Sequence, residues 1–589
     1  MNNPQLFYNQ ELETYKTNVA SDKKRLVFYS SMRLLVFLVT AIAIYLTFST
    51  WQLALTIGII GTGIFIYLLS KYIDTKSRQK LNKALLHINS EELKIATGDF
   101  HHRNTGLQYQ DPKHFYSLDI DLFGKGSFFQ YIDRSISKEG KLTLSEVLKA
   151  NNVSNIEERQ DAIKELSEKA KWRQLYSATG SLIQTETPAL KIIYWLKNHK
   201  NFIPKKMKWV PWFFTVISVT LLILSILKKL DISFFGYWLF IGLGITGLYL
   251  KKINVLSANS DKAKDTFKQY ASLLLQIENE TFTSKLLQLK QQQIQSEGKK
   301  ASTIFSEFSK HLDALDNRNN LIGAIFGNGY LLSDIKNAYK VEQWISEYSH
   351  KVEDWFEVVT FFDAYNSLGT YTFNHIEHVF PKISKDGITL DAKDLGHPLL
   401  NKTKRISSDV IINNQEFFIV TGANMAGKST FLRTVSLHIM MANVGLPVCA
   451  KSSVYSPVKL ITSMRTSDSL TDDSSYFFSE LTRLKFIVDT TEKEPYFIIL
   501  DEILKGTNST DKAIGSKKFV EKLVAGEATG IIATHDLSLC EISEELDEVK
   551  NYYFDAEIVD NELYFDYKFK RGICQNMNAS FLLKKMKII

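Results

Sequence analysis

The sequence predicts a multidomain protein in which an α-helical core carries two transmembrane helical hairpins and is followed by a C-terminal α/β domain. Three observations predict this fold class. The chain has 589 residues, more than the roughly 250–300 at which a single core stops growing. Charge-free apolar runs occur in two adjacent pairs, and a phosphate-loop pattern follows them near Gly422.

The composition is that of a largely soluble chain with a mild positive charge. Hydrophobic residues make up 45% and charged residues 23%, both near globular averages. The net charge of +7 is too small for this length to indicate nucleic acid by itself. The sequence has three cysteines, Cys449, Cys540 and Cys574. They form no CxxC motif, and no histidine lies at a spacing typical of zinc ligands, so we expect no disulfide framework and no zinc site.

The first hairpin is predicted within residues 1–80. Its two spans, residues 34–50 and 53–70, contain no charged residue, and each is near the roughly 20 residues that cross a bilayer. A cleaved signal peptide is not expected, because the first run leads into another span instead of a small-residue cleavage site. A pair of buried core helices is the alternative interpretation.

The second hairpin is predicted at residues 209–250, with spans at 209–227 and 232–250 around a short polar turn. Because the paired arrangement occurs twice, spanning helices are favoured over buried core helices. The second span of each hairpin also contains the pattern IGxxxTG, whose small residues let helices approach closely in lipid.

Basic residues at the ends of the apolar runs predict the orientation in the membrane, since positively charged loops stay in the cytoplasm. Lys228 and Lys229, in the outer turn of the second hairpin, oppose this orientation mildly. We therefore expect an integral membrane protein with four spans, whose termini and α/β domain face the cytoplasm. The residues that predict it are Lys23, Lys24, Arg25, Arg33, Lys71, Lys76, Arg78, Lys80, Lys205, Lys206, Lys208, Lys251 and Lys252.

Residues 81–208 and 251–390 are expected to form the helical core. Leucine and isoleucine recur at helical spacing in IEERQDAIKELSEKA, and residues 261–369 contain no proline. Alternating polarity in SSDVIINNQEFFIV then indicates strands. The α/β domain is therefore expected at residues 391–589.

A phosphate-binding loop is predicted in FFIVTGANMAGKST, residues 417–430. A short apolar strand leads into the loop, and a helix containing Leu432 and Val435 follows it. Backbone N–H groups of such a loop surround phosphate oxygens, while Lys428 can reach the β- and γ-phosphates and Ser429 can bind Mg²⁺. The candidate ATP-binding residues are Gly422, Ala423, Asn424, Met425, Ala426, Gly427, Lys428, Ser429 and Thr430.

Two further strands are predicted to end in polar residues of the same site. PYFIILDEILKGTNSTD delivers Asp501, a candidate Mg²⁺ ligand through water, and Glu502, a candidate for orienting or deprotonating the attacking water. GIIATHDLSLCEI delivers His535, placed to sense the γ-phosphate. Because strand ends of a doubly wound sheet meet at one crevice, we expect Lys428, Glu502 and His535 to be catalytic. The alternatives are solvated acids capping a strand and a structural histidine.

These motifs resemble the ATPase domain of the MutS family of DNA mismatch repair proteins, an ABC-type ATPase. TGANMAGKST is similar to the family's TGPNMGGKST and departs from it at Ala423 and Ala426. DEILKGTNSTD resembles DEIGRGTSTYD, ATHDLSL resembles ATHYxEL, and the similarity extends to the HPLL segment that begins at His397. The resemblance implies a Mg²⁺-dependent ATPase.

The resemblance also implies a site shared between two subunits. SDSLTDDSSYFFSEL is similar to the family's SDDLxxGxSTFxxEM, which makes Ser475 the serine that reaches the γ-phosphate of a partner subunit. An ATP-dependent homodimer is therefore expected, with Asn424 as the family's loop asparagine. The sequence departs from the family's pattern here, since Asp473 stands at the glycine and Ser474 follows at a position where the family has arginine. The alternative role for Ser475 is capping of the next helix.

The helical part resembles the family's lever domain, starting at DLFGKGSFFQYIDRSIS. The family's mismatch-reading domain has no counterpart, since the first hairpin occupies residues 1–100. The second hairpin interrupts the lever near the expected position of a DNA clamp. The resemblance therefore implies that any DNA binding is not selective for mismatches.

The favoured function is a membrane-anchored MutS-like ATPase that couples ATP hydrolysis in a dimer to lever motion, with DNA binding left open. A transporter is an alternative, although the spans are separated, charge-free and accompanied by no LSGGQ signature. A membrane-bound ATP switch for a protein or lipid partner is another. The lysine-rich run 188–208 has no acidic residue and suits anionic lipid or a phosphodiester.

Overall fold

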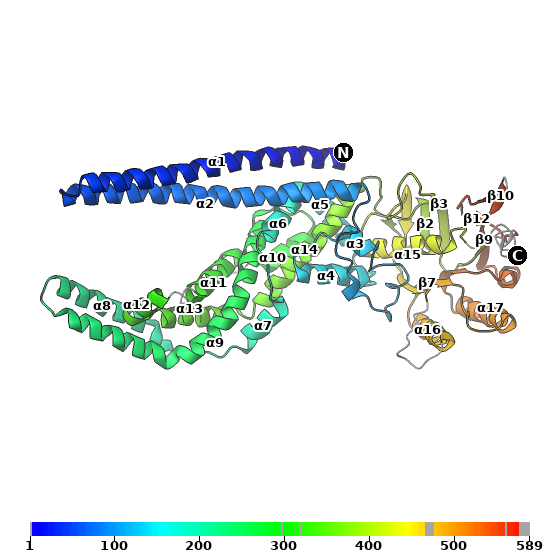
Figure 1. Cartoon of the computed structure of the whole chain (residues 1–589). Coiled ribbons are helices and arrows are strands. Elements are labelled where there is room, and N and C mark those ends of the chain that lie inside the picture. The colour runs from blue at the N-terminus through cyan, green and yellow to red at the C-terminus, as the bar shows by residue number, and fades with distance from the viewer. Residues whose placement is uncertain are drawn as a thin grey trace.

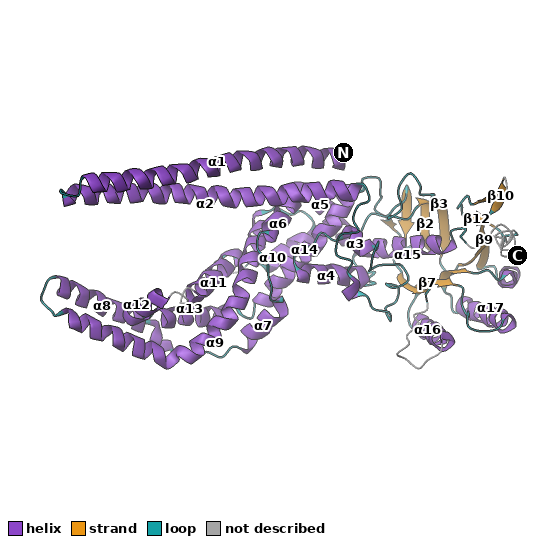
Figure 2. Ribbon diagram, viewed as in Figure 1, coloured by secondary structure: helices purple, strands orange, loops and turns teal. Residues whose placement is uncertain are grey.

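The protein is elongated, with two helical arms at one end and the strands at the other (Figure 1). Figure 2 shows the same division into a long helical part and a mixed part of helices and strands. The computed structural model describes residues 3–295, 298–316, 321–423, 425–465, 476–559 and 562–575.

The first arm consists of α1 (Pro4–Leu46) and α2 (Trp51–Ala96), which lie side by side (Figure 1). Asn3 begins α1 because its side chain accepts a hydrogen bond from the Gln5 N–H, at 3.0 Å. The buried carboxylate of Asp22 joins the helices, since it accepts hydrogen bonds from Arg78 and Asn82. Nearer the tip the side chains are apolar and exposed.

The second arm consists of α8 (Val210–Ile226), the outer half of α9 (Ile232–Asn279) and the short helix α12 (Leu321–Leu331). Asp231 begins α9 by accepting a hydrogen bond from the Ser233 N–H at 2.8 Å. The inner half of α9 is amphipathic and buries Phe267, Tyr270 and Leu274 in the core. One continuous helix therefore links the arm to the core.

The helical core surrounds α14 (Val352–Asn374), whose apolar and small residues are buried along most of its length. Aromatic rings fill the space between α9 and its neighbours, with Phe267 in edge contact with Phe305, Phe308 and Trp344. The other core helices are α3 (Phe128–Ile132), α4 (Lys138–Lys149), α5 (Ile156–Glu168), α6 (Ala170–Ser181), α7 (Ala189–Asn198), α10 (Lys285–Gln293), α11 (Ala301–Asp316) and α13 (Ser333–Tyr348).

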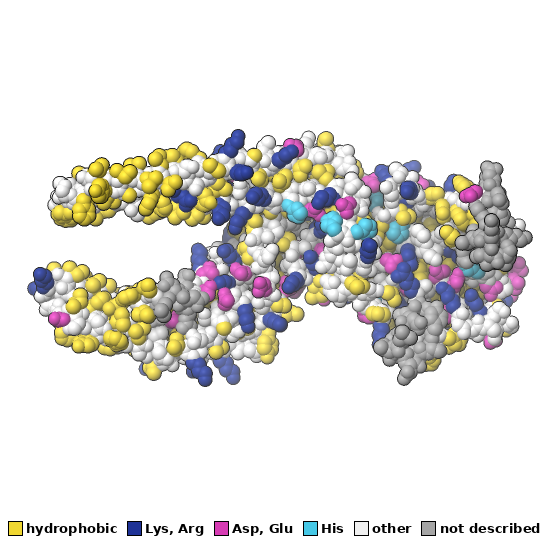
Figure 3. All heavy atoms as spheres, viewed as in Figure 1, with side chains coloured by type: hydrophobic (Ala, Val, Ile, Leu, Met, Phe, Trp, Pro, Cys, Tyr) yellow, Lys and Arg dark blue, Asp and Glu magenta, His cyan; other side chains and the backbone are white. Residues whose placement is uncertain are grey.

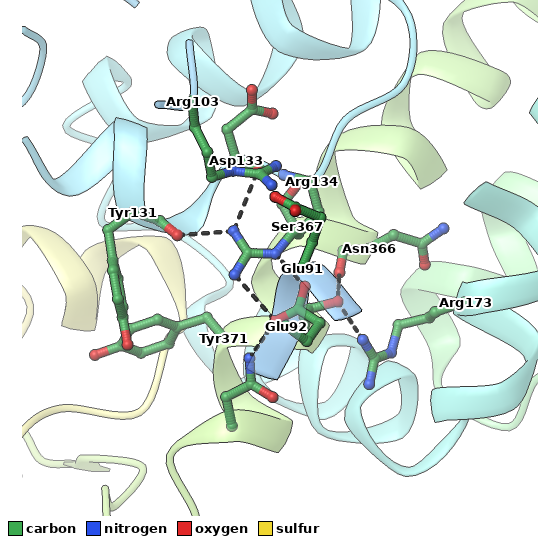
Figure 4. A network of polar contacts seen from close by, with 12 residues as sticks. Glu91, Glu92, Arg103, Tyr131, Asp133, Arg134, Arg173, Asn366, Ser367 and Tyr371 are labelled. Atoms are coloured by element: carbon green, nitrogen blue, oxygen red, sulfur yellow. Dashed lines mark hydrogen bonds and ion pairs between the residues drawn. The ribbon is translucent and has the colours of Figure 1, made fainter. Parts of the chain in front are cut away.

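A buried polar network fastens the first arm to α14 (Figure 4). Glu92 of α2 pairs with Arg134, and its Oε2 also accepts a hydrogen bond from Asn374 at 2.9 Å. Tyr8 of α1 donates to the Asn374 Oδ1 at 2.7 Å. Burial alone would raise the pKa of Glu92, but the Arg134 guanidinium outweighs it and holds that pKa below its ordinary value.

The mixed end contains two sheets. Its six-stranded sheet has the order β12-β9-β4-β8-β7-β6, and all neighbours except β12 pair in parallel. The strands are β4 (Phe417–Gly422), β6 (Lys459–Ser463), β7 (Tyr496–Asp501), β8 (Thr529–Ala533), β9 (Val549–Phe554) and β12 (Lys570–Arg571).

The smaller sheet has the order β1-β5-β2-β3, and a separate pair, β10 and β11, lies near the C-terminus. Their bounds are β1 (Lys382–Ile383), β2 (Ile388–Leu395), β3 (Ser408–Asn413), β5 (Ser452–Tyr455), β10 (Glu557–Val559) and β11 (Glu562–Tyr564). The helices of this end are α15 (Lys428–Val444), α16 (Tyr476–Thr491), α17 (Ser509–Ala525) and α18 (Ile542–Glu545).

The apolar runs predicted from the sequence lie within longer helices. Among the described residues, α1, α2 and α9 are long and apolar enough to cross a membrane, while α8 is apolar but has only 17 residues. α2 continues without a break past residue 80, and α9 past residue 250, so the arms and the core share helices.

Candidate nucleotide-binding site

The loop between β4 and α15 is shaped by glycines at both of its ends. A Cβ on Gly422 would lie 2.7 Å from the carbonyl oxygen of Phe554, which leaves no space for a side chain. Gly427 has a φ of 105°, which favours glycine, and α15 begins at the next residue. The loop therefore leads directly to a helix N-terminus, where backbone N–H groups favour anions. Asn424 lies outside the described residues.

Lys428 lies at the centre of the strand ends. Its side chain is buried, and its ammonium group donates hydrogen bonds to the carbonyls of Gly422 at 2.6 Å and Ala423 at 3.1 Å. His535 Nε2 lies 3.2 Å from the same ammonium group. Burial lowers the pKa of Lys428, against the opposing effect of the carboxylates of Glu502 and Asp501.

Ser429 and Asp501 form an oxygen-rich pair beside the loop. The Ser429 hydroxyl donates to the Asp501 Oδ2 at 2.7 Å. Burial raises the pKa of Asp501, and the hydrogen bond from Ser429 opposes that rise. No group of three or more His, Cys, Asp or Glu suited to a metal occurs in the described part of the chain. The pair nevertheless fits Mg²⁺, which takes few protein oxygens and completes its shell with water and phosphate.

Glu502 and His535 form the second polar pair. His535 Nε2 lies 2.7 Å from Glu502 Oε1, and this hydrogen bond, acting against burial, lowers the pKa of Glu502 to about 2. The Glu502 backbone has a φ of 50°, and its N–H donates to the Ala533 carbonyl at 2.9 Å. β8 thus fixes the backbone that presents the Glu502 carboxylate, which is ionised at neutral pH.

The structure brings five of the candidate residues together, as expected from converging strand ends: Lys428, Ser429, Asp501, Glu502 and His535. They meet because β4, β8 and β7 are neighbours in the sheet, in that order. Of the other candidate loop residues, Ala423 and Ala426 are buried, while Met425 and Thr430 are exposed. Ser475 lies outside the described residues. The functional roles assigned to all these residues stay predictions.

Tyr567 is a site residue that the sequence analysis missed. A Cβ on Gly427 would lie 3.1 Å from its ring, so the ring covers the end of the phosphate-binding loop. Tyr567 reaches this position from the far C-terminal part of the chain, between β11 and β12. Its only sequence signal is a run of alternating aromatic residues, which is also the pattern of a strand.

Asp121 was missed as well, and it joins the helical part to the site. Its carboxylate accepts hydrogen bonds from the Arg465 guanidinium at 2.7 and 3.0 Å and pairs with Arg433 of α15 at 2.9 Å. Nearby, Asp119 accepts from the Thr462 hydroxyl at 2.6 Å and from the Arg465 N–H at 2.8 Å. One segment of the helical part therefore contacts both α15 and the residues that follow β6.

Residues 418–586, which contain all of these strand ends, match the family model of MutS domain V. The C-terminal part of the chain is similar to MutS domain V, and residues 418–586 are called domain V below. The similarity to the MutS family predicted from the loop and strand motifs is therefore confirmed for this part.

Individual MutS proteins show the same relationship. Human "MutS protein homolog 4" is 33% identical over 202 residues, which cover 32% of this chain and 21% of that protein. A "DNA mismatch repair protein MutS" of Bacteroides fragilis is 30% identical over 201 residues, 32% of this chain and 23% of that protein. One of Clostridium botulinum is 28% identical over 244 residues, 40% of this chain and 26% of that protein. The chain thus spans about a quarter of the length of these relatives.

Proposed function

We propose that this chain is a membrane-anchored ATPase whose domain V binds and hydrolyses ATP with Mg²⁺. The observation that carries the proposal is the meeting of Lys428, Ser429, Asp501, Glu502 and His535 at three adjacent strand ends, next to a helix N-terminus. The match of this segment to domain V supports the same activity.

In the proposed reaction the loop N–H groups and the Lys428 ammonium bind the β- and γ-phosphates. Ser429 and Asp501 would hold Mg²⁺, which neutralises phosphate charge when bound. A water oxygen attacks the γ-phosphorus while the Glu502 carboxylate accepts a proton from that water. The bond between the γ-phosphorus and the β–γ bridging oxygen breaks, which releases ADP and phosphate. His535 holds the Glu502 carboxylate in place, and an N–H group of its ring can donate a hydrogen bond to an oxygen of the γ-phosphate.

An ATP-dependent homodimer is part of the proposal. It is supported by the similarity of the segment containing Ser475 to the MutS signature stretch. Ser475→Ala is expected to weaken nucleotide-dependent association without abolishing ATP binding. Light scattering during turnover measures the oligomeric state of the protein. If the protein hydrolyses ATP while it stays a monomer, the shared site is contradicted.

Membrane anchoring is supported by the surfaces of the two arms. Their apolar side chains are exposed, including Phe37 at 60%, Phe48 at 77% and Phe240 at 69%. Both arms project away from domain V in the same direction, so one bilayer can accept both, and blue Lys and Arg side chains lie nearer the core on the first arm (Figure 3). We propose that domain V and both termini face the cytoplasm.

An ATP-driven membrane switch is a second candidate function, and the attachment of the first arm favours it. Glu92 and Tyr8 fasten that arm to Asn374, at the end of α14 nearest domain V. Motion of α14 on ATP binding would therefore move the arm and its lipid or protein partner. A transporter is less well supported, because the two arms are separate instead of forming one bundle (Figure 3).

DNA binding is a further candidate function, suggested by the names of the relatives, which include DNA mismatch repair proteins. We propose that any such binding depends on phosphate contacts and does not discriminate mismatches. Affinities for paired and G·T-containing duplexes would differ by less than about tenfold, or roughly 1.4 kcal/mol, on this account.

The activity is tested with purified protein in nanodiscs. The wild type should hydrolyse ATP when Mg²⁺ is present, and Lys428→Ala should lose both nucleotide binding and hydrolysis. A Lys451→Ala variant serves as a matched control, because this lysine is exposed and lies beyond α15. Equal hydrolysis by the wild type and Lys428→Ala would refute the proposed site.

A further inference from the structure

The short helix α12 has the sequence LIGAIFGNGYL, which contains no charged residue. With 11 residues it is too short to cross a bilayer, and the sequence analysis assigned it no role. In the structure it packs against α8 and α9, the two helices of the second arm. Figure 1 shows it beside these helices, well out along the arm.

Two contacts show how far along the arm α12 reaches. The Ser218 hydroxyl donates to the Tyr330 carbonyl at 2.7 Å and accepts a hydrogen bond from the Trp238 indole at 2.8 Å. A Cβ on Gly242 would clash with the Gly329 carbonyl, so α9 and α12 touch backbone to backbone there. Ser218 and Gly242 each lie near the middle of an apolar run. The end of α12 therefore lies at the mid-depth of the predicted spans.

The outward face of α12 continues the apolar surface of the arm. Ile322 is 68% exposed and Phe326 is 55% exposed, comparable with Ile223 of α8 at 50%. An apolar surface that extends over three adjacent helices is unusual in water. Hydrocarbon is the environment that matches it on all three helices.

The turn after α12 satisfies polar groups within the protein. The Asn328 side chain accepts a hydrogen bond from the Asp334 N–H at 2.8 Å, and the Ser333 hydroxyl donates to the Gly327 carbonyl at 3.0 Å. Asn328 and Asp334 are both buried. A chain that reverses within a bilayer needs this internal pairing, because hydrocarbon offers no hydrogen bonds.

We infer that α12 enters the hydrocarbon layer from the cytoplasmic side and returns to it, so that the second arm inserts as a three-helix unit. The partner of its outward face is the acyl chains of the bilayer. In the chain α12 follows the core helix α11 and precedes the core helix α13, so the chain enters and leaves the layer on the side of the core. This inference rests on the proposed membrane anchoring.

Spin labels on introduced cysteines test the inference in the full-length protein. Phe326→Cys probes α12, Ile223→Cys probes the predicted span in α8, and Ile411→Cys probes an exposed position on β3 of the smaller sheet. The native cysteines are buried, so labelled wild-type protein provides the background. Each variant is reconstituted in phosphatidylcholine–phosphatidylglycerol vesicles, and collision with oxygen is compared with collision with a water-soluble nickel chelate.

Labels at positions 326 and 223 should both favour oxygen, while the label at position 411 should favour the nickel chelate. If position 223 favours oxygen but position 326 behaves like position 411, α12 lies in water and this inference is overturned, although the anchoring stands. If positions 223 and 326 both favour the chelate, the anchoring of this arm fails, and the inference fails with it.

Discussion

The Nε2 atom of His535 lies 2.7 Å from the Oε1 atom of Glu502, although the two residues follow different strands of the sheet. The same imidazole nitrogen lies 3.2 Å from the Lys428 ammonium group. His535 therefore connects the candidate base to the lysine of the phosphate-binding loop. Substitutions of His535 and Glu502 should therefore change kcat, whereas substitution of Lys428 should also change ATP binding.

His535→Ala is expected to lower kcat by about 10²-fold, at the low end of general acid–base effects, with little change in ATP affinity. A base with a lowered pKa stays ionised until the pH falls through that low value. Removing His535 should return the pKa of Glu502 toward its ordinary range, so the acid limb of the kcat profile should move to higher pH. His87→Ala, at an exposed position on α2, is the control. An unchanged acid limb would contradict the proposed pairing.

Asp121→Asn should reduce hydrolysis more than ATP binding, because Asp121 contacts Arg433 and Arg465 and not the loop itself. The carboxylate is partly exposed, so the loss of unfolding free energy should be only about 1 kcal/mol. Asp489→Asn, which removes an exposed ion pair with Lys485, is the matched control. If kcat is unchanged while stability falls, Asp121 serves the fold alone.

Glu92→Gln should destabilise the protein by about 3–5 kcal/mol, because it leaves the buried Arg134 without its carboxylate. Chemical denaturation in detergent measures the change. Glu91→Gln, one residue away and partly exposed, should cost much less. Equal effects of the two substitutions would show that the network in Figure 4 does not hold the first arm to the core.

Val219→Arg should impair membrane insertion of the second arm, since Val219 is exposed near the middle of its span and a charge at mid-span costs about 2.5 to 3.5 kcal/mol on insertion scales. Ile411→Arg places the same charge on an exposed position on β3 of the smaller sheet and should have no such effect. Extraction of membranes with alkaline carbonate, followed by protease protection of the second arm, compares the variants. Release of the wild type by carbonate would reject membrane integration.

The parts of the fold predicted well are those in which local sequence determines the structure. The apolar strand that ends at Gly422, the helix from Lys428 and the acids at the end of β7 follow from short contiguous patterns. The strand predicted to deliver His535 ends two residues before it, at Ala533. Helix ends were less predictable, because charged residues continue α1, α2 and α9 beyond the apolar runs into the core.

The parts that escaped prediction depend on contacts between distant segments. Asp121 meets Arg465 across 344 residues of sequence, and Tyr567 reaches the loop at Gly427 from near the C-terminus. α12 is short and weakly patterned, so only its packing against Ser218 and Gly242 distinguishes it from a core helix. Sequence patterns identified the candidate residues of the site, whereas tertiary structure was needed to find the residues that position them.

Hydrolysis by Glu502→Gln tests the central claim most directly. The substitution keeps the size of the side chain and removes the carboxylate that accepts the proton of water. With Glu521→Gln on α17 as a partly exposed control, we predict that Glu502→Gln binds ATP with wild-type affinity but that its turnover with Mg²⁺ falls by about 10²-fold or more. Wild-type turnover by Glu502→Gln would contradict the proposed ATPase site.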